Sequence, residues 1–243
     1  AASTLADGLL ERIARVFGPD HPSTLVCCDS LILLHDTREE HDEAVRLARE
    51  TYERKLRTFG QEHAQSTETL GLLGRALLGN GEYPEAEEIL WQAVEKRETT
   101  LGRVEEFGLR ARQDMAQLYS RTGRNAEALE LLDELLAIAD EYPSDGIVNL
   151  GRCLWLRGLA LAAESRTEEA EAVLRRGLET QLNALGERHP ETLDSLVDLG
   201  RILVQLGREA EARALWERAL ARTEQMFGPE HARSRRVQEL LGR

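Results

Sequence analysis

The amino-acid sequence repeats with a period of 42 residues, and this period limits the chain to a narrow range of folds. A phenylalanine or leucine followed by glycine recurs on this period at Phe17-Gly18, Phe59-Gly60, Leu101-Gly102, Leu185-Gly186 and Phe227-Gly228, with a degenerate copy at Pro143-Ser144. A second series on the same period consists of Ala44, Ala86, Ala128, Ala170 and Ala212. A fixed period of about 20 to 50 residues indicates stacked copies of one supersecondary unit.

Each repeat contains two segments with helical periodicity. In residues 60–101, the first segment extends from Thr67 to Leu78 with leucines at helical spacing, and Gly79-Asn80-Gly81 predicts its end. The second segment begins near Pro84, which suits a first helical turn, and its apolar stripe consists of Ala86, Ile89, Leu90, Ala93 and Val94. Neither helix can cover its apolar face alone, so the pairs must stack on one another.

Small residues recur where the two helices of a repeat are expected to cross. They are Gly74, Ala116, Gly158 and Gly200 in the first helix, and the alanine series in the second. With the leucines around them, these repeats resemble the tetratricopeptide repeat. The longer second helix and the Leu/Phe-Gly-x-x-His-Pro linker, as in 17–22 and 185–190, resemble the 42-residue form found in kinesin light chain and in many bacterial and fungal signalling proteins.

The resemblance implies an all-α fold, a right-handed superhelical solenoid of antiparallel helix pairs with about twelve helices. We expect one solenoid domain over residues 1–243, in which 1–17 form the second helix of a truncated unit and 228–243 form the first helix of a further unit. The full units between them are predicted at 18–59, 60–101, 102–143, 144–185 and 186–227. Because both ends cut through a unit, we expect a fragment of a longer protein; a natural short chain with imperfect terminal units is the alternative.

Composition argues against several classes of function. The formal net charge is −13, whereas general nucleic-acid binding requires a basic surface. Acidic helix faces are usually solvated surface, although a specific basic partner is the alternative. No apolar run approaches the roughly 18 residues of a membrane span and no signal peptide is recognisable, which predicts a cytoplasmic protein without membrane contact. The spacing of Cys27, Cys28 and Cys153 fits neither a disulfide framework nor a metal site.

Four histidines are the most obvious candidates for metal ligands, because histidine is the commonest one. They lie one per unit, at His21, His63, His189 and His231. Stacking of the units separates them, so we interpret them as part of the linker structure. No zinc-protease motif, phosphate-binding loop or nucleophile elbow is present. The sequence therefore predicts a protein that is not an enzyme and uses no metal and no cofactor.

The resemblance implies that the first helices line a concave groove that holds ligands. Transferred to this chain, it predicts a peptide-binding groove composed of Arg75, Arg110, Gln113, Gln117, Arg121, Arg152, Trp155, Leu156, Leu159 and Arg201, with further candidates Asp29, Glu68, Leu72, Asp114, Asp194 and Asp198. Arginine and tryptophan are typical of binding hot spots. Trp155 could instead pack in the core if the degenerate linker at 141–146 shifts its unit, whereas Trp91 and Trp216 are predicted to be packing residues.

We therefore expect a non-catalytic scaffold or sensor module that binds a peptide or helix, either from another protein or from another domain of its parent chain. Because similar repeats often accompany signalling ATPases, kinases or proteases, the resemblance suggests a regulatory role. The groove lacks the lysine and asparagine of the clamp that holds chaperone tails, so chaperone-tail binding is not expected. Self-association through exposed solenoid ends is the alternative function.

Overall fold

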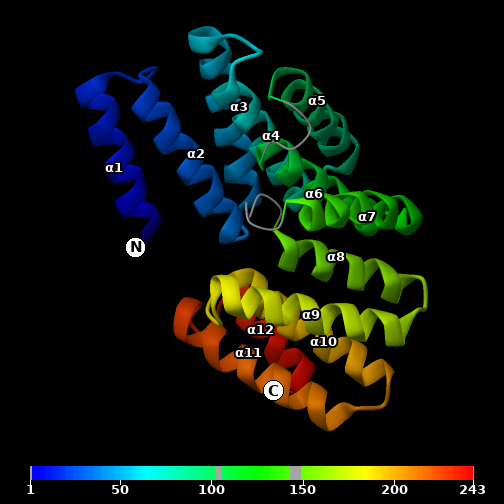
Figure 1. Ribbon diagram of the computed structural model, residues 1–243. Coiled ribbons are helices and arrows are strands. Elements are labelled where there is room, and N and C mark those ends of the chain that lie inside the picture. Colours follow the sequence, from blue (N-terminus) through cyan, green and yellow to red (C-terminus); the bar gives the residue numbers. More distant parts are fainter. Residues whose placement is uncertain (1, 102–105, 143–148, 243) are drawn as a thin grey trace. The chain divides into compact units, whose positions relative to one another are not determined.

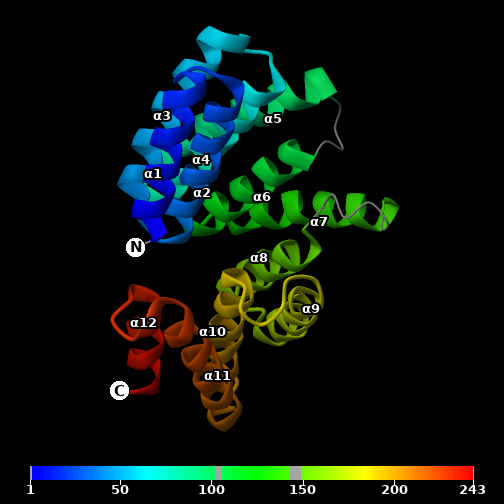
Figure 2. The ribbon, with the colours of Figure 1, turned by 90° about the vertical axis from the view of Figure 1, so that its left-hand side faces the viewer.

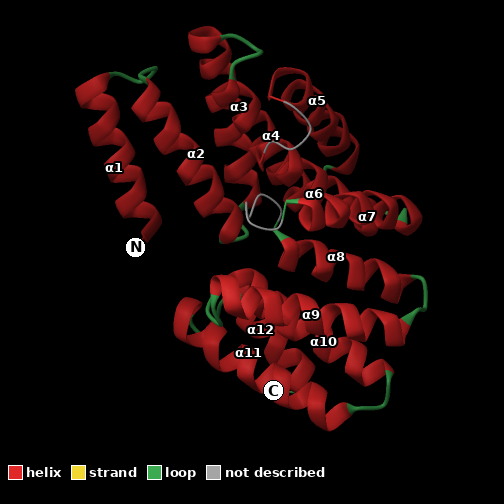
Figure 3. Ribbon diagram, in the orientation of Figure 1, coloured by secondary structure: helices red, strands yellow, loops and turns green. Residues whose placement is uncertain are grey.

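The computed structural model describes residues 2–101, 106–142 and 149–242, and all regular secondary structure in these ranges is helical (Figures 1 and 3). The twelve helices of the described residues are α1 (Ala2–Phe17), α2 (Pro22–Thr37), α3 (His41–Phe59), α4 (Ala64–Asn80), α5 (Tyr83–Leu101), α6 (Glu106–Arg121), α7 (Asn125–Glu141), α8 (Leu150–Ala163), α9 (Thr167–Leu185), α10 (Pro190–Gln205), α11 (Glu209–Phe227) and α12 (Ala232–Leu241). The all-α prediction is confirmed.

The chain forms two compact units, Ala1–Leu118 and Tyr119–Arg243. Within the first unit, α1 packs on α2, α2 on α3, α3 on α4 and α4 on α5. Within the second unit, the same sequential packing joins the helices from α7 to α12. In addition, α2 contacts α4 (Figure 2) and α8 contacts α10, so the first helices of neighbouring pairs lie side by side. Residues 143–146 of the degenerate linker lie outside the described residues.

The regular spacing of the linkers reflects two helix caps. Gly18 and Gly60 adopt positive φ angles of 96° and 87° immediately after α1 and α3, a conformation that glycine adopts without steric cost. The following histidine is the N-cap of the next helix, since Nδ1 of His63 accepts a hydrogen bond from the backbone N–H of Gln65 at 3.2 Å. His21, His189 and His231 make the equivalent bond. Three of these imidazoles also stack on the phenylalanine before the glycine.

The small residues of the first helices lie where the helices cross, as predicted. A Cβ atom on Gly74 would approach the Leu90 side chain to 2.7 Å, and one on Gly158 would approach Leu174 to 2.5 Å. The alanine series of the second helices is fully buried, and it comprises Ala44, Ala86, Ala128, Ala170 and Ala212. A Cβ atom on either glycine would therefore overlap the leucine of the second helix unless that side chain moved.

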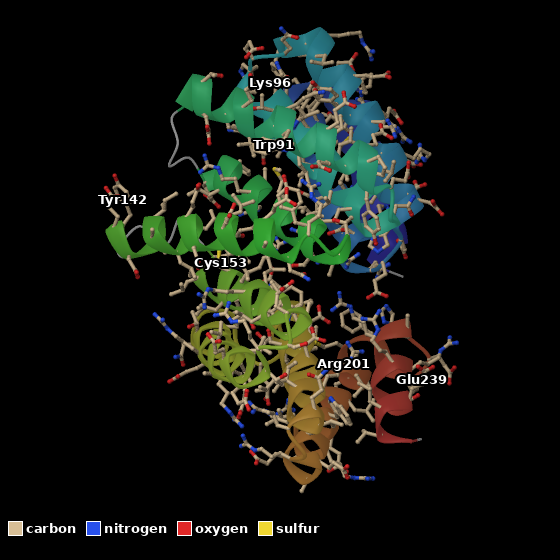
Figure 4. All side chains as sticks on the ribbon, turned by 90° about the vertical axis from the view of Figure 1, so that its right-hand side faces the viewer. Trp91, Lys96, Tyr142, Cys153, Arg201 and Glu239 are labelled. Carbon is tan, nitrogen blue, oxygen red and sulfur yellow. The ribbon has the colours of Figure 1, made fainter. Side chains whose placement is uncertain are left out.

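The two tryptophans predicted to be packing residues have different environments. Trp216 of α11 is buried, and its indole Nε1–H donates to the backbone oxygen of Val197 at 3.0 Å. The prediction for Trp91 is wrong, because its side chain on α5 is 51% exposed (Figure 4). The corresponding position of the other repeats holds Arg49, Asp133, Arg175 and Glu217, which are all exposed. The position therefore faces solvent.

Candidate functional site

In the compact unit Ala1–Leu118, an ion pair joins helices α2 and α4. Arg75 of α4, a predicted groove residue, donates from Nε to Asp36 of α2 at 2.8 Å. Burial acts to raise the pKa of Asp36, but His41, whose Nδ1 lies 3.5 Å from Oδ1 of Asp36, and the guanidinium of Arg75 outweigh it and lower this pKa below its ordinary value. Arg75 therefore links α4 to α2 through this ion pair.

A pocket opens beside Arg75 and extends from α4 to α5 and α6. It contains about 340 Å³ of empty space, part of which is open to solvent, and it is lined by Thr67, Glu68, Gly71, Leu72, Arg75, Ala93, Arg97, Phe107, Arg110, Ala111 and Asp114. All of these residues belong to the first unit. The pocket brings together two predicted groove residues, Arg75 and Arg110, with the further candidates Glu68, Leu72 and Asp114.

An aromatic ring and two guanidinium groups form one wall of this pocket. The guanidinium carbon of Arg97 lies 4.8 Å from the centroid of the Phe107 ring, and that of Arg110 lies 5.5 Å from it. Arg110 also donates to Glu106 at 2.8 Å. Burial, to which the charge of Asp29 adds, raises the pKa of Glu68, another lining residue, although nearby cations oppose this shift. The pocket therefore offers both charges beside an apolar surface.

The remaining predicted groove residues on α6 differ in accessibility. Gln113 is buried, with 2% of its surface exposed, whereas Gln117 is half-buried and Arg121 is exposed. Asp29, a candidate on α2, is also buried and pairs with the buried amine of Lys55. The expectation that Asp29 contacts a ligand in the groove is therefore wrong, because α3 supplies an internal partner for its carboxylate.

In the second unit, Trp155 connects α8 to α10. Its indole Nε1–H donates to Oδ2 of Asp198 at 3.1 Å, and Oδ1 of Asp198 accepts from Arg201 at 2.9 Å. The ring is partly buried against a hydrophobic cluster formed by α9, α10, α11 and α12. Arg201 is exposed on α10 (Figure 4). Two predicted groove residues, Trp155 and Arg201, thus both donate hydrogen bonds to the carboxylate of Asp198.

Two other predicted groove residues on α8 lie in the interior. Leu156 is 1% exposed and Arg152 is 6% exposed, while Leu159 is half-buried. The close approach of α8 to α9 explains this burial, because Gly151 is so near Gln181 that an added Cβ would lie 2.5 Å from its Cγ. Leu156 and Arg152 are therefore not the open contacts that were expected. The predicted combination of Arg110 with Trp155 joins residues of different units and stays a prediction.

The sequence reasoning did not identify the pocket, although a signal for it was present. The repeat position of Gly71 holds a larger residue in the other units, namely Asp29, Gln113, Trp155 and Val197. Phe107 and Arg97 also went unnoticed, because neither occupies one of the positions at which related repeats contact ligands. The available sequence signal was a glycine, Gly71, at a position where the other repeats carry a larger side chain.

We expect one carboxyl group of the second unit to titrate well above the ordinary range. Burial raises the pKa of Asp194 to about 6, the neighbouring Asp198 adds to this rise, and Arg233 and Arg236 oppose it. Since an unfolded aspartate has a pKa of about 3.9, folded Asp194 binds its proton more tightly, and its contribution to stability should fall as the pH rises through about 4 to 6. Carboxyl-carbon NMR should show the transition near pH 6, and Asp194→Asn should flatten the stability profile over this range. A midpoint near 4 would contradict this expectation.

The described residues contain no group of three or more histidine, cysteine, aspartate or glutamate side chains that could hold a metal ion. The three cysteine thiols are free. Within the same part of the chain, no helix combines the length and the apolar character that crossing a bilayer requires. What the arrangement offers chemically is a set of apolar and charged contacts for another molecule.

Comparison with known proteins identifies a family. Residues 24–65, 65–141 and 151–225 match the family described as tetratricopeptide repeat. No curated protein matches the chain in sequence.

Several solved structures are similar to this chain. The nearly identical TPR-like repeats of a Podosopora anserina protein assigned as a kinesin light chain share 27% identity, with a TM-score of 0.57, over 85% of this chain and 97% of that one. BtubC (BKLC) from P. vanneervenii shares 19% identity, with a TM-score of 0.60, over 83% and 84% of the two chains. PlcR from Bacillus thuringiensis, solved with the peptide PapR7 and DNA, shares 13% identity, with a TM-score of 0.67, over 88% and 74%.

Proposed function

The chain belongs to the tetratricopeptide repeat family, whose fold is that of a non-catalytic protein-interaction scaffold, and from this premise we propose that its first helices bind a peptide or helix. The observation that carries the proposal is the pocket between α4, α5 and α6, where Phe107 lies beside the guanidinium groups of Arg97 and Arg110. Aromatic and arginine side chains around an apolar hollow are the usual material of interaction hot spots.

The charges of the pocket favour a peptide with carboxylate groups. Arg75, Arg97 and Arg110 line it together with Glu68 and Asp114, so three guanidinium groups contribute to its wall. Charge-assisted hydrogen bonds to guanidinium groups are stronger than neutral ones. The binding of the PapR7 peptide by PlcR, a neighbour in fold, is consistent with a peptide ligand. The ligand comes from another protein or from another domain of a larger regulatory protein in the cytoplasm.

The proposal is tested by selecting binders from a random peptide library displayed on phage. We expect selected peptides to lose about tenfold in affinity for Arg110→Glu, because one charge-assisted contact contributes about 1.5 kcal/mol, and this loss should shrink at high salt. Arg213→Glu is the matched control, since Arg213 is an exposed arginine on α11 of the other unit. Failure to select any peptide, or equal binding to both variants, contradicts the proposal.

Self-association is a second candidate, favoured by one observation on α1. Leu9 is 54% exposed, whereas Thr51, Ala93, Leu135 and Ala219 at the same repeat position are buried. A second copy of the chain that covers this face would remove an apolar side chain from water. Sedimentation equilibrium distinguishes the candidates, because only self-association predicts a concentration-dependent mass that Leu9→Glu abolishes.

A further inference from the structure

A tryptophan lies on the solvent-facing side of α5, away from the pocket. Trp91 is 51% exposed (Figure 4), whereas Ala93 and Arg97, the residues of α5 that line the pocket, are buried. Because successive residues of an α-helix are about 100° apart around its axis, Trp91 and Ala93 lie on nearly opposite sides of the helix. The surface around Trp91 is therefore separate from the pocket.

Trp91 is the centre of a row of exposed residues at the spacing of one helix face, which we call the α5 stripe. The α5 stripe consists of Pro84, Glu88, Trp91, Glu95 and Thr99. Trp91 thus has one glutamate about a turn before it and another about a turn after it. Glu88 accepts a hydrogen bond from the neutral amide of Gln92 at 3.2 Å. Among the residues that the structure describes, no cation forms an ion pair with Glu88 or Glu95.

Two other repeats show what the position of Trp91 does when it holds a cation. Arg49 of α3 pairs with Glu85 of α5 at 2.7 Å, and Arg175 of α9 pairs with Glu211 of α11 at 3.3 Å. Both arginines thus reach an acidic side chain of the next second helix. Trp91 occupies the same repeat position and replaces the cation with an aromatic ring. The α5 stripe therefore combines an exposed ring with two carboxylates and contains no cation.

An aromatic face between two carboxylates suits an arginine side chain. A planar guanidinium stacks on aromatic faces, and among these the indole of tryptophan gives the strongest cation–π contact. Carboxylates accept the guanidinium N–H groups in charge-assisted hydrogen bonds. The formal net charge of −13 also favours the approach of a basic partner.

We propose that the α5 stripe docks a basic segment of another protein, with an arginine guanidinium stacked on Trp91 between the carboxylates of Glu88 and Glu95. The inference goes beyond the proposed function, because the α5 stripe and the pocket lie on different sides of the helix. It makes two specific claims. The ligand must carry a cation, and the ring of Trp91 must be present.

A defined peptide tests the first claim without the natural partner. The probe is acetyl-Gly-Arg-Gly-Arg-Gly-amide, and the measurement is two-dimensional NMR of the full chain, whose three tryptophans give one indole N–H signal each. We expect a saturable shift of the Trp91 signal, with a dissociation constant on the order of 1 mM at low salt, and weaker binding at high salt. The same peptide with citrulline in place of arginine has nearly the same shape but no charge, and it should bind at least fivefold more weakly. Equal binding of the two peptides overturns the inference.

Changes in the α5 stripe test the second claim. Trp91→Arg introduces the residue found in α3 and α9, and it should weaken binding at least tenfold, followed by the amide signals of α5, while the melting temperature is retained because the side chain is exposed. Glu88→Gln with Glu95→Gln should weaken binding at least fivefold. The matched control is Glu11→Gln with Glu53→Gln, which removes the same charge from exposed positions of α1 and α3 and should bind the peptide normally. Equal losses for the two double variants, or undiminished binding by Trp91→Arg, contradict the inference.

The same variants separate this inference from the proposed function. Peptides selected for the pocket should weaken with Arg110→Glu and be indifferent to Trp91→Arg, whereas the arginine peptide should show the reverse pattern. If Arg110→Glu weakens the arginine peptide as much as Trp91→Arg does, the α5 stripe is not its site and the inference is wrong. If every selected library peptide weakens with Trp91→Arg and none with Arg110→Glu, the α5 stripe is supported and the proposed function is wrong.

Discussion

Replacing Lys55 with methionine should lower the free energy of unfolding by about 3–5 kcal/mol, because the change leaves a buried carboxylate without its counter-charge. The Lys55 side chain is fully buried, and its amine pairs with Asp29 and donates to the backbone oxygen of Gln65 at 3.2 Å. The hydroxyl of Thr69 donates to the other oxygen of Asp29 at 2.7 Å. Burial raises the pKa of Asp29, and the charge of Lys55 opposes this rise. Urea denaturation followed by circular dichroism measures the loss.

Two comparisons identify the unpaired charge as the cause. The double variant Lys55→Met with Asp29→Leu should recover most of the lost stability, since a buried ion pair replaced by apolar residues of similar volume is often neutral. The single variant should regain stability on acidification, because Asp29 then becomes neutral in the folded state. Arg57→Met removes an exposed cation from the same helix and should cost less than about 0.5 kcal/mol. A Lys55→Met variant as stable as Arg57→Met would show that the pair contributes little.

The helices and linkers could be predicted because they depend on local chemistry. The second helix of residues 60–101 was expected to begin near Pro84, and α5 spans Tyr83–Leu101. The linker histidines were expected to be structural, and each of the four caps a helix. A cap involves residues two or three positions apart, so a sequence pattern contains all of its participants.

The candidate site was predicted less well, because one repeat position can have very different surroundings. Asp29, Gly71 and Trp155 share a position, yet Asp29 is buried against Lys55, Gly71 faces open space and Trp155 is half-buried. The residue that determines whether this position is buried lies on another helix and differs from repeat to repeat. Periodicity therefore predicts which positions lie between helices, whereas burial depends on partner residues distant in the sequence.

The helix crossings illustrate the same dependence on partners, since side-chain sizes at two positions vary in opposite directions. Gly200 of α10 is close to Trp216 of α11, because a Cβ on Gly200 would lie 2.3 Å from the indole nitrogen. In the other repeats, the corresponding pairs are Gly74 with Leu90, Ala116 with Leu132, Gly158 with Leu174 and, with the sizes reversed, Ile32 with Ala48. All the side chains of these pairs are buried. A large residue at one position is therefore compatible only with a small one at the other.

We expect this reciprocity to produce strong energetic coupling between Gly200 and Trp216. Gly200→Ile alone should cost about 3 kcal/mol or more, because the added side chain would overlap the indole. Trp216→Ala alone should cost about 3–5 kcal/mol, because it leaves a cavity and removes the hydrogen bond to Val197. The measurement is urea denaturation of both single variants and the double variant.

Combining the two changes recreates the Ile32–Ala48 arrangement of the first full unit at the α10–α11 crossing. The isoleucine then occupies space that the indole vacates, so the double variant should be at least about 2 kcal/mol more stable than the sum of the single losses predicts. Ala219→Val with Ala128→Val, at buried positions in different helix pairs of the second unit, is the additive control. Additive losses for Gly200→Ile and Trp216→Ala would mean that the helix backbones, rather than the paired side chains, set the distance between α10 and α11.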